Sequence, residues 1–250
     1  MQAQNSTFKW DNNKKFRIAY VDEPPFYWTE GNLVKGADIE LAEVVLREIG
    51  IISIEYYHTT FEELLSGVLA GRWDMNVPIF VTSERVKEVA FSLPVWSLGD
   101  GFVVLRGNPK GLISYEAVKM RSDARLGLIP GQKQFDAAKL TGVNDSQIMM
   151  FNNQPDAVAA LLAGKIDAFA ATAIGNNAIA EANPELESVP HKNSGDGKSP
   201  VGAFSFSKDN NELLQAVNEQ LRKYIGSDDH RTRMAKYGIT ETEIDEVVNK

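Results

Sequence analysis

Short apolar runs alternate along the chain with longer segments in which apolar residues recur every three or four positions. The first run, residues 16–21, is typical of a strand, and it ends before Pro24 and Pro25, which have no backbone N–H to donate to a sheet. Residues 38–49 show helical spacing, and Gly50 is placed to end that helix. Continued alternation of this kind predicts an α/β fold built around a mainly parallel sheet.

The same alternation predicts the remaining elements. Further strands are expected at 51–57, 74–79, 101–105, 126–129, 148–151, 167–170 and 203–206. Helices are expected at 60–70, 114–120, 132–140, 155–163 and 213–224, with a short helix that opens at Thr82 and two more within 228–250. The pattern restarts after residues 107–109, which predicts a second α/β lobe. The polar stretch 192–200, rich in Gly, Ser and Pro, predicts a return crossing between the lobes.

Composition narrows the class of protein. The chain has 250 residues, with 26 Lys and Arg against 34 Asp and Glu, so its formal net charge is −8. An acidic chain of this kind is not expected to bind nucleic acid or an anionic membrane by general electrostatics. No apolar run reaches about 18 residues, the length of a membrane span, and the N-terminus is polar rather than signal-like. Either the protein is cytosolic or its leader has been removed.

Several site chemistries are disfavoured. The chain has no Cys, which excludes disulfides, thiolate metal sites and cysteine nucleophiles. His58, His191 and His230 stand far apart in the sequence, so a metal site has little support. The sequence also lacks the glycine-rich loops that bind dinucleotides or nucleoside phosphates, and we expect no cofactor.

Residues 81–86 contain the first candidate binding feature. Thr82 is a good helix N-cap, and the open backbone N–H groups of a first helical turn favour an anion. Arg85 in that turn adds a planar guanidinium that suits a carboxylate. The alternative is an ordinary capped helix, in which Arg85 faces solvent and pairs with Glu84 or Glu88.

Four motifs, in order along the chain, resemble one family. They are Pro24-Pro25-Phe26, Gly36-Ala37-Asp38-Ile39-Glu40-Leu41-Ala42, Thr82-Ser83-Glu84-Arg85 with Phe91-Ser92-Leu93-Pro94, and Gly164-Lys165-Ile166-Asp167-Ala168. Together they are similar to the polar-amino-acid-type extracellular solute-binding proteins of ABC importers, over residues 16–238. The resemblance implies an α/β, two-lobed periplasmic-binding-protein fold (type II), with two Rossmann-like lobes joined by a two-stranded hinge. Residues 1–97 plus 196–250 would form lobe 1, and residues 98–195 lobe 2.

The resemblance also implies residue roles, and the chain departs from two of them. In that family the arginine of the T-x-E-R motif grips the ligand carboxylate, a role carried over to Arg85. A Ser or Thr five residues before this arginine usually helps to bind the amino-acid head group, but here that residue is Phe80, with Pro78 two residues earlier. Where the family commonly places an Asp on the ligand ammonium, this chain has Thr172. The usual α-ammonium site is therefore expected to be absent.

Three phenylalanines are expected at the cleft instead. Phe26 follows the first strand, Phe61 begins the helix after the second strand, and Phe80 lies beside the Arg85 helix. Such strand ends converge on the cleft of α/β lobes. Three aromatic faces can hold a delocalised or alkylated cation, with Glu23 as a counter-charge. The alternative for each Phe is ordinary core packing.

These positions resemble the branch that contains the ectoine and hydroxyectoine binders. The segments that carry this likeness are Glu23-Pro24-Pro25-Phe26, Phe61, Phe80 with Arg85, and Gly107-Asn108-Pro109 followed by Gly111-Leu112 and Ser114-Tyr115. In the second lobe, Gln132, Lys133 and Gln134 stand in place of the Gly- and Thr-rich turn usual there. Lys133 and Gln134, at a helix start, either contact a carboxylate or hydroxyl or face solvent. Further aromatic candidates are Tyr27, Trp96 and, directly after the cleft loop, Trp28.

The sequence therefore predicts a monomeric, non-enzymatic periplasmic receptor with one site, which delivers a small zwitterion to an ABC permease. The expected ligand is an ectoine-like compatible solute, a betaine-like compound or a modified amino acid. The candidate ligand-binding residues are Glu23, Phe26, Phe61, Phe80, Thr82, Arg85, Gln132, Lys133, Gln134 and Thr172.

Three alternatives are open at this point. The first is a general polar amino-acid receptor. The second is an enzyme, because cyclohexadienyl and arogenate dehydratases resemble the same fold, and Glu23 would then be the general acid with a pKa raised by burial. The third is the sensor domain of a membrane kinase.

Overall fold

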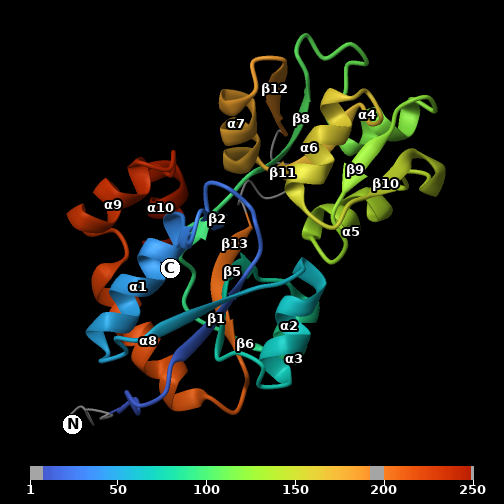
Figure 1. Cartoon of the computed structure of the whole chain (residues 1–250). Coiled ribbons are helices and arrows are strands. Elements are labelled where there is room, and N and C mark those ends of the chain that lie inside the picture. Colours follow the sequence, from blue (N-terminus) through green and yellow to red (C-terminus); the bar gives the residue numbers. More distant parts are fainter. Residues whose placement is uncertain (1–7, 192–199, 249–250) are drawn as a thin grey trace.

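The first apolar run of the chain forms β1, which lies inside the sheet of lobe 1 in the computed structural model (Figure 1). The structure describes residues 8–191 and 200–248. The strands of lobe 1 are β1 (Phe16–Tyr20), β4 (Ile54–His58), β5 (Met75–Phe80), β6 (Ala90–Phe91), β7 (Trp96–Ser97) and β13 (Val201–Phe206). Their order is β4-β1-β5-β13-β6, with β7 also paired to β13. β1 is parallel to both β4 and β5, whereas β13 is antiparallel to all its partners.

Lobe 2 repeats this arrangement with a second sheet. Its strands are β8 (Asp100–Leu105), β9 (Leu126–Leu128), β10 (Ile148–Met150), β11 (Ala168–Thr172) and β12 (Leu186–Pro190). Their order is β10-β9-β11-β8-β12. β9 is parallel to β10 and β11, whereas β8 is antiparallel to β11 and β12. Both sheets are therefore mixed, and the prediction of mainly parallel pairing is wrong for the strands next to the lobe crossings, which enter their sheets from the opposite end.

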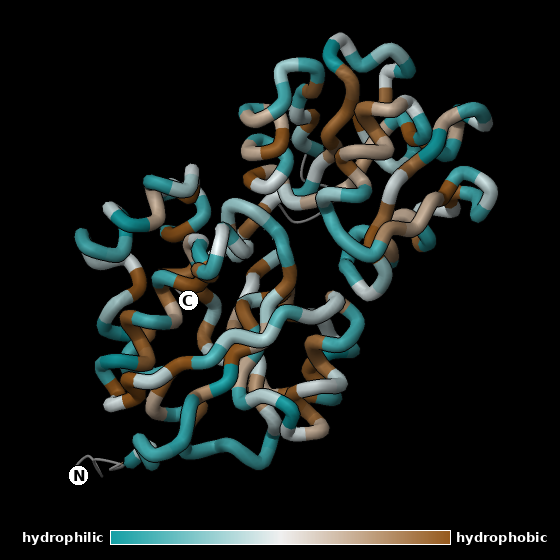
Figure 2. The backbone as a smooth tube through the Cα atoms, viewed as in Figure 1, coloured by the Kyte–Doolittle hydropathy of each residue, from teal (hydrophilic) through white to brown (hydrophobic). Residues whose placement is uncertain are grey.

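Helices cover both faces of each sheet. In lobe 1 they are α1 (Ala37–Glu48), α2 (Phe61–Leu69), α3 (Ser83–Glu88), α8 (Asn211–Tyr224), α9 (Asp228–Ala235) and α10 (Glu241–Val248). In lobe 2 they are α4 (Tyr115–Met120), α5 (Lys133–Thr141), a 3-10 turn (Asp145–Gln147), α6 (Gln154–Leu162) and α7 (Ala173–Ala182). Figure 1 shows α1 and α8 on one side of the lobe 1 sheet and α2 with α3 on the other. Figure 2 shows hydrophobic segments gathered between these layers in each lobe, which confirms the predicted α/β, two-lobed fold.

Two parts of the fold are not predicted by the apolar pattern. Helix α7 is rich in alanine and asparagine, so few large apolar residues mark a helical periodicity in it. Strand β12, which follows it, is only partly buried and shows no clear apolar run. A short hairpin of β2 (Trp28–Glu30) and β3 (Leu33–Lys35) is largely exposed, so its sequence shows no alternation of apolar and polar residues.

Two predictions fall outside the described residues. The predicted return crossing falls mostly on residues 192–199, and the expected lobe boundary at 195/196 lies within them.

Two chain segments connect the lobes. One runs from β7 to β8, and the other follows β12 and leads into β13. Their described parts are hydrogen-bonded to each other: Leu98 N–H donates to the carbonyl of Pro200 at 3.0 Å, and His191 N–H donates to the carbonyl of Asp100 at 2.9 Å. The two crossings thus lie side by side where the sheets meet.

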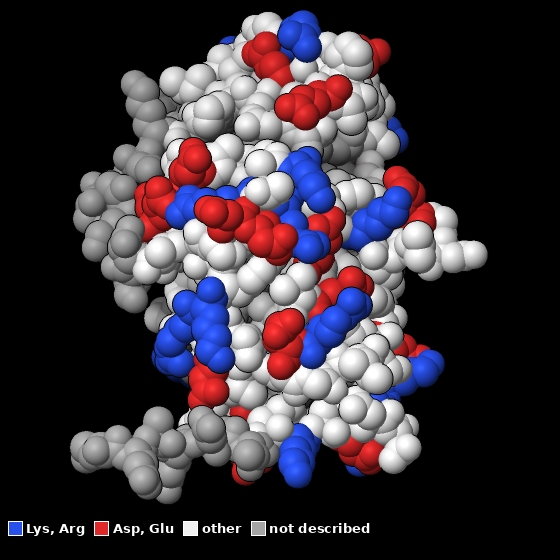
Figure 3. Space-filling view, turned by 90° about the vertical axis from the view of Figure 1, so that its left-hand side faces the viewer, with Lys and Arg blue, Asp and Glu red and all other residues white. Residues whose placement is uncertain are grey.

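Three findings on the described residues bear on the kind of site that this chain can form. None of the described helices is long and apolar enough to cross a membrane. Within residues 8–191 and 200–248, no group of three or more His, Asp or Glu side chains is placed to hold a metal ion. On the face shown in Figure 3, positive and negative side chains are interspersed rather than gathered into one patch.

Candidate ligand-binding cleft

A small cavity lies between the lobes. The space left in it for water is about 20 Å³, room for about one water molecule, so the two lobes are closed on each other in this structure. Lobe 1 supplies the lining residues Glu23, Phe26, Tyr27, Phe61, Pro78, Ile79, Phe80 and Trp96. Leu98 lies at the crossing, and lobe 2 supplies Gln132, Lys133, Gln134 and Thr172. We call this space the aromatic cavity.

The loop that carries Phe26 is held by the start of helix α1. Ala37 N–H donates to the carbonyl of Pro25 and Asp38 N–H to the carbonyl of Phe26, both at 3.0 Å. These are N–H groups that a helix terminus would otherwise leave unpaired. Gly36 allows the contact, because it has a φ of 132° and a side-chain carbon there would overlap the Phe26 carbonyl. Local backbone pairing thus fixes Phe26 at the cavity.

Trp96 forms an aromatic wall with Phe26 and Phe80. Its ring lies 5.9 Å from Phe26 and 5.2 Å from Phe80 between centroids, the latter nearly perpendicular at 83°. The indole N–H donates to Asp38 Oδ1 at 3.1 Å. Asp38 is fully buried, and burial raises its pKa well above the usual range, although the bond from Trp96 opposes that rise. The Asp38 carboxyl group therefore orients the Trp96 ring.

Gly202 on β13 leaves the space that the Trp96 ring fills. A side-chain carbon at position 202 would overlap the six-membered ring of Trp96. We expect Gly202→Ala to push this ring toward the cavity and to destabilise the protein by about 1–3 kcal/mol, as overpacking of a core does. Thermal unfolding will measure the loss of stability, and a titration of the same variant should show weaker ligand binding. Gly50→Ala is a comparison in which the new carbon meets open space, although the φ of 89° there adds backbone strain.

Arg85 bridges the two lobes. Nη1 donates to the carbonyl of Phe80 in lobe 1, and Nη2 donates to the carbonyl of Gly131 in lobe 2, both at 2.7 Å. The guanidinium carbon also lies 5.3 Å from the ring centre of Phe61. Arg85 is 8 % exposed, and burial lowers its pKa. Among the described residues no carboxylate lies within ion-pair distance of it, although buried charges in proteins are ordinarily paired.

Glu23 is the buried carboxylate of the cavity. Its carboxylate accepts hydrogen bonds from the Tyr27 hydroxyl at 3.1 Å and from the Gln132 amide at 3.3 Å. Glu23 is 8 % exposed. Burial raises its pKa, while the bonds from Tyr27 and Gln132 and the charge of Arg85 act in the opposite direction. This group is placed to meet a cation or a hydrogen-bond donor.

Asp100, at the start of β8, organises the lobe 2 side. It accepts a hydrogen bond from the Gln134 amide at 2.8 Å, and its other oxygen lies 3.8 Å from Lys133 Nζ. Lys133 Nζ also lies 5.2 Å from the ring centre of Phe80 across the cleft. Thr172 lines the cavity and accepts a hydrogen bond from Gly175 N–H at 3.0 Å, which caps α7.

The structure brings most of the predicted site residues together. Those that line the aromatic cavity are Glu23, Phe26, Phe61, Phe80, Gln132, Lys133, Gln134 and Thr172. Arg85 contacts two of them, Phe61 and Phe80. Thr82 instead caps α3 by accepting the Arg85 N–H at 3.3 Å and does not line the cavity. Trp28 also lies elsewhere, with its ring 6.3 Å from that of Tyr237.

All three phenylalanines have more than one role. Phe26 and Phe80 belong to the lobe 1 core and also line the cavity, so core packing and ligand contact are not exclusive. Phe61 and Phe80 each face a cation of the protein, Arg85 and Lys133 respectively. Sequence reasoning assigned no role to Asp38 or Asp100. Their hydrogen-bond partners, Trp96 and Gln134, stand far away in the sequence.

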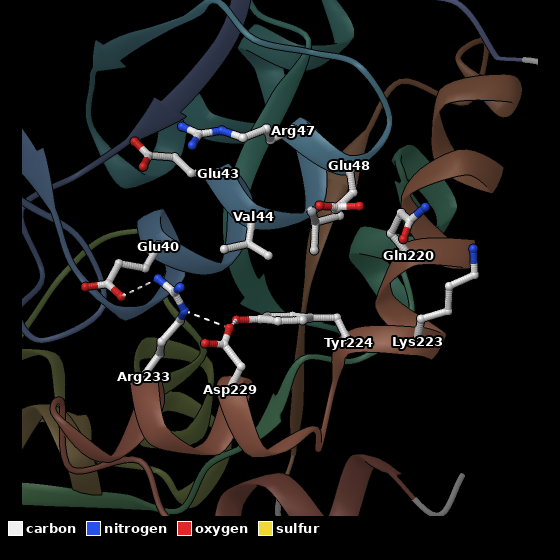
Figure 4. Close-up of a pocket in the computed structure, with 11 residues that line it drawn as sticks. Glu40, Glu43, Val44, Arg47, Glu48, Gln220, Lys223, Tyr224, Asp229 and Arg233 are labelled. Carbon is white, nitrogen blue, oxygen red and sulfur yellow. Dashed lines mark hydrogen bonds and ion pairs between the residues drawn. The ribbon is translucent and has the colours of Figure 1, made fainter.

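A larger hollow on the outer face of lobe 1 has different chemistry (Figure 4). It lies between α1, α8 and α9, and three of its charged side chains, Glu40, Asp229 and Arg233, pair with one another. Asp229 accepts hydrogen bonds from the Tyr224 hydroxyl at 2.6 Å and from Arg233 Nε at 2.8 Å, and Arg233 lies 3.6 Å from Glu40. Lobe 2 contributes nothing to this hollow. The cleft, which both lobes line, is therefore the candidate ligand site.

Two α/β lobes around a lined cleft define the class of two-lobed solute-binding proteins. The chain belongs to the bacterial extracellular solute-binding proteins, family 3, whose pattern matches residues 16–240. This family consists of binding proteins, so the chain is a solute binder and not an enzyme.

Named relatives extend over most of the chain. A probable amino-acid ABC transporter periplasmic-binding protein of Sinorhizobium fredii is 31% identical over 93% of this chain and 80% of that protein. A probable histidine-binding protein of Campylobacter jejuni is 25% identical over 86% of this chain and 81% of that protein.

Solved structures share the fold. EhuB in complex with hydroxyectoine has a TM-score of 0.82 at 24% identity, covering 93% of each chain. An ancestral arginine-binding protein bound to glutamine has a TM-score of 0.78 at 26% identity, covering 89% of this chain and 97% of that one.

Proposed function

We propose that this chain is the substrate-binding component of an ABC importer, which captures a small zwitterionic carboxylate in the interlobe cleft and delivers it to a permease of the inner membrane. The observation that carries the proposal is the buried Arg85, which donates to backbone carbonyls of both lobes and has no carboxylate partner among the described residues. The naming of the Sinorhizobium fredii relative supports the importer and the periplasmic location.

The carboxylate end of the ligand would lie near Arg85. A guanidinium carries five N–H groups, and two of them are used by the carbonyls of Phe80 and Gly131. The remaining three suit a carboxylate, to which Arg binds in a fork geometry. Lys133 adds a second positive charge in the lining of the aromatic cavity. The rings of Phe61 and Phe80 lie within cation–π distance of Arg85 and Lys133 respectively and so stabilise both cations.

The cationic end would lie between Glu23 and the aromatic wall. Phe26, Tyr27 and Trp96 line the cavity together with Glu23, and a delocalised or alkylated cation gains from both the ring faces and the carboxylate. Thr172 stands on the lobe 2 side, where its hydroxyl is engaged in capping α7. This chemistry favours an ectoine-like compatible solute, a betaine-like compound or a modified amino acid as the ligand.

A general polar amino-acid receptor is the second candidate. It is favoured by the relatives, since an ancestral arginine-binding protein bound to glutamine has the same fold at 26% identity. In that case the Glu23 carboxylate and the side-chain oxygen of Gln132 would accept hydrogen bonds from the α-ammonium group, in place of an aspartate at position 172. In either case a ligand that contacts both lobes stabilises their closed arrangement by a shift of population.

Thermal unfolding with a panel of ligands tests the proposal. The protein is first unfolded and refolded to remove any bound molecule, and then mixed with millimolar ectoine, hydroxyectoine, glycine betaine, proline betaine or polar amino acids. A ligand at ~1,000 times its Kd stabilises the native state by about 4 kcal/mol. A raised midpoint with a compatible solute alone supports the first candidate. A rise only with ordinary amino acids selects the second, and no rise with any zwitterion would overturn both.

A further inference from the structure

A second cavity adjoins the aromatic cavity within the same cleft. The space that water can occupy in it is about 100 Å³, and the residues that line both spaces are Glu23, Phe61 and Gln132. We call it the second chamber. Both lobes contribute to it, with Asp22 and His58 from lobe 1 and Gln154 from lobe 2. None of the latter three is among the residues predicted to bind the ligand.

Two buried amide oxygens at the second chamber have no hydrogen-bond partner among the described residues. They are Oε1 of Gln132, which is 4 % exposed, and Oε1 of Gln154, which is 6 % exposed. A buried acceptor left without a donor costs about 1–3 kcal/mol. Native proteins pair nearly all such groups, with protein atoms, ordered water or a ligand. Two of them at one cavity therefore point to a donor that enters from outside the chain.

The charged side chains differ between the two parts of the cleft. Lys133 lines the aromatic cavity, and Arg85 contacts Phe61 and Phe80 in its lining. The carboxylate of Glu23 lines both spaces, whereas that of Asp22 lines only the second chamber. Asp22 Oδ2 lies 3.0 Å from Nε2 of His58 at an exposed position. The second chamber is therefore rich in acceptors and suits a neutral or cationic group that carries N–H donors.

We propose that the second chamber is a ligand subsite, in which Gln154 and Gln132 accept hydrogen bonds from a planar N–H-bearing group, such as an amide, urea or guanidinium, at the far end of the ligand. This rests on the proposed function, because the carboxylate at the near end is held at Arg85. The ligand then extends beyond the aromatic cavity. A quaternary ammonium compound does not meet this requirement, because it has no N–H to donate.

Calorimetric titration of Gln154→Met tests the proposal with three probes on refolded, ligand-free protein. L-Arginine and L-citrulline end in a guanidinium and a urea, whereas L-norleucine ends in a methyl group and offers no donor. Methionine keeps the length of the glutamine side chain and removes its acceptor. Gln220→Met makes the same exchange at the outer hollow of lobe 1 (Figure 4) and is the matched control. Thermal unfolding of both variants establishes that they fold.

We expect Gln154→Met to weaken L-arginine and L-citrulline about tenfold, which corresponds to the loss of one buried hydrogen bond, and to leave L-norleucine unchanged. Equal changes for all three probes, or no change for any, would mean that water rather than ligand fills the second chamber. If wild-type protein binds ectoine or glycine betaine but none of the three probes, the subsite is wrong and the proposed function stands. If it binds no zwitterion at all, the proposed function itself fails.

Discussion

Replacing Arg85 with alanine is expected to weaken the binding of a carboxylate ligand by at least about a hundredfold, while the protein stays folded. The substitution removes the buried cation that faces the carboxylate. It also removes the hydrogen bonds from Arg85 to Phe80 and Gly131, one in each lobe, and so makes closure less favourable. Isothermal titration of the ligand found in the thermal panel measures the change.

Two further variants show whether the effect belongs to the cleft. Arg47→Ala removes an arginine at the outer hollow of lobe 1 and should leave the Kd unchanged. Arg85→Lys keeps the charge but loses the planar fork, so we expect an affinity between those of wild type and Arg85→Ala. Wild-type affinity in Arg85→Ala would show that the ligand carboxylate lies elsewhere.

Glu23→Gln is expected to weaken the binding of a zwitterion or cation by about tenfold or more and to remove its pH dependence between acidic and neutral pH. Burial holds the pKa of Glu23 above its usual value in the free protein, and a bound cation favours the charged form. Binding therefore releases a proton from Glu23 when the pH lies below that raised pKa. Wild-type affinity should fall as the pH is lowered through the raised pKa and level off above it.

Titrations across this pH range in buffers of different ionisation enthalpy measure the released proton directly. His58 also lines the second chamber, where its Nε2 lies 3.0 Å from Asp22 Oδ2. His58→Gln is therefore the control, and it should retain the dependence that Glu23→Gln removes. A pH dependence that survives in Glu23→Gln and disappears in His58→Gln would move the counter-charge from Glu23 to the Asp22–His58 pair.

The convergence of cleft residues was predictable from chain order. Phe26, Phe61 and Phe80 each stand at or just beyond a strand end of lobe 1, at β1, β4 and β5, and β1 lies between the other two in the sheet. Neighbouring parallel strands place such positions at one edge. The short helix after Thr82 followed from local capping chemistry, which the structure confirms for α3.

Contacts between distant segments could not be predicted in this way. The bonds from Trp96 to Asp38 and from Gln134 to Asp100 join residues 58 and 34 positions apart. They depend on how elements pack rather than on local spacing. The same holds for the bond from Arg85 to Gly131, which exists only because the two lobes meet. Helix α7 was missed because its burial rests on few large apolar side chains.

The lobe division also has a physical basis in the sheet pairing. Described strands between residues 100 and 190 pair only with one another, and those up to residue 97 pair with β13 and among themselves. We propose on this basis that residues 1–97 plus 196–250 form one lobe and residues 98–195 the other. The crossings would then act as the hinge about which the lobes close on a ligand.

We expect one zwitterionic ligand to be held in the cleft through its carboxylate. Isothermal titration of the refolded protein with the zwitterion that gives the largest thermal shift, and with its methyl ester, tests this most directly. The expected result is one bound molecule per chain for the acid and an affinity at least about a hundredfold lower for the ester, which lacks the negative charge of the carboxylate. Equal affinity for acid and ester, or a stoichiometry above one, would contradict it.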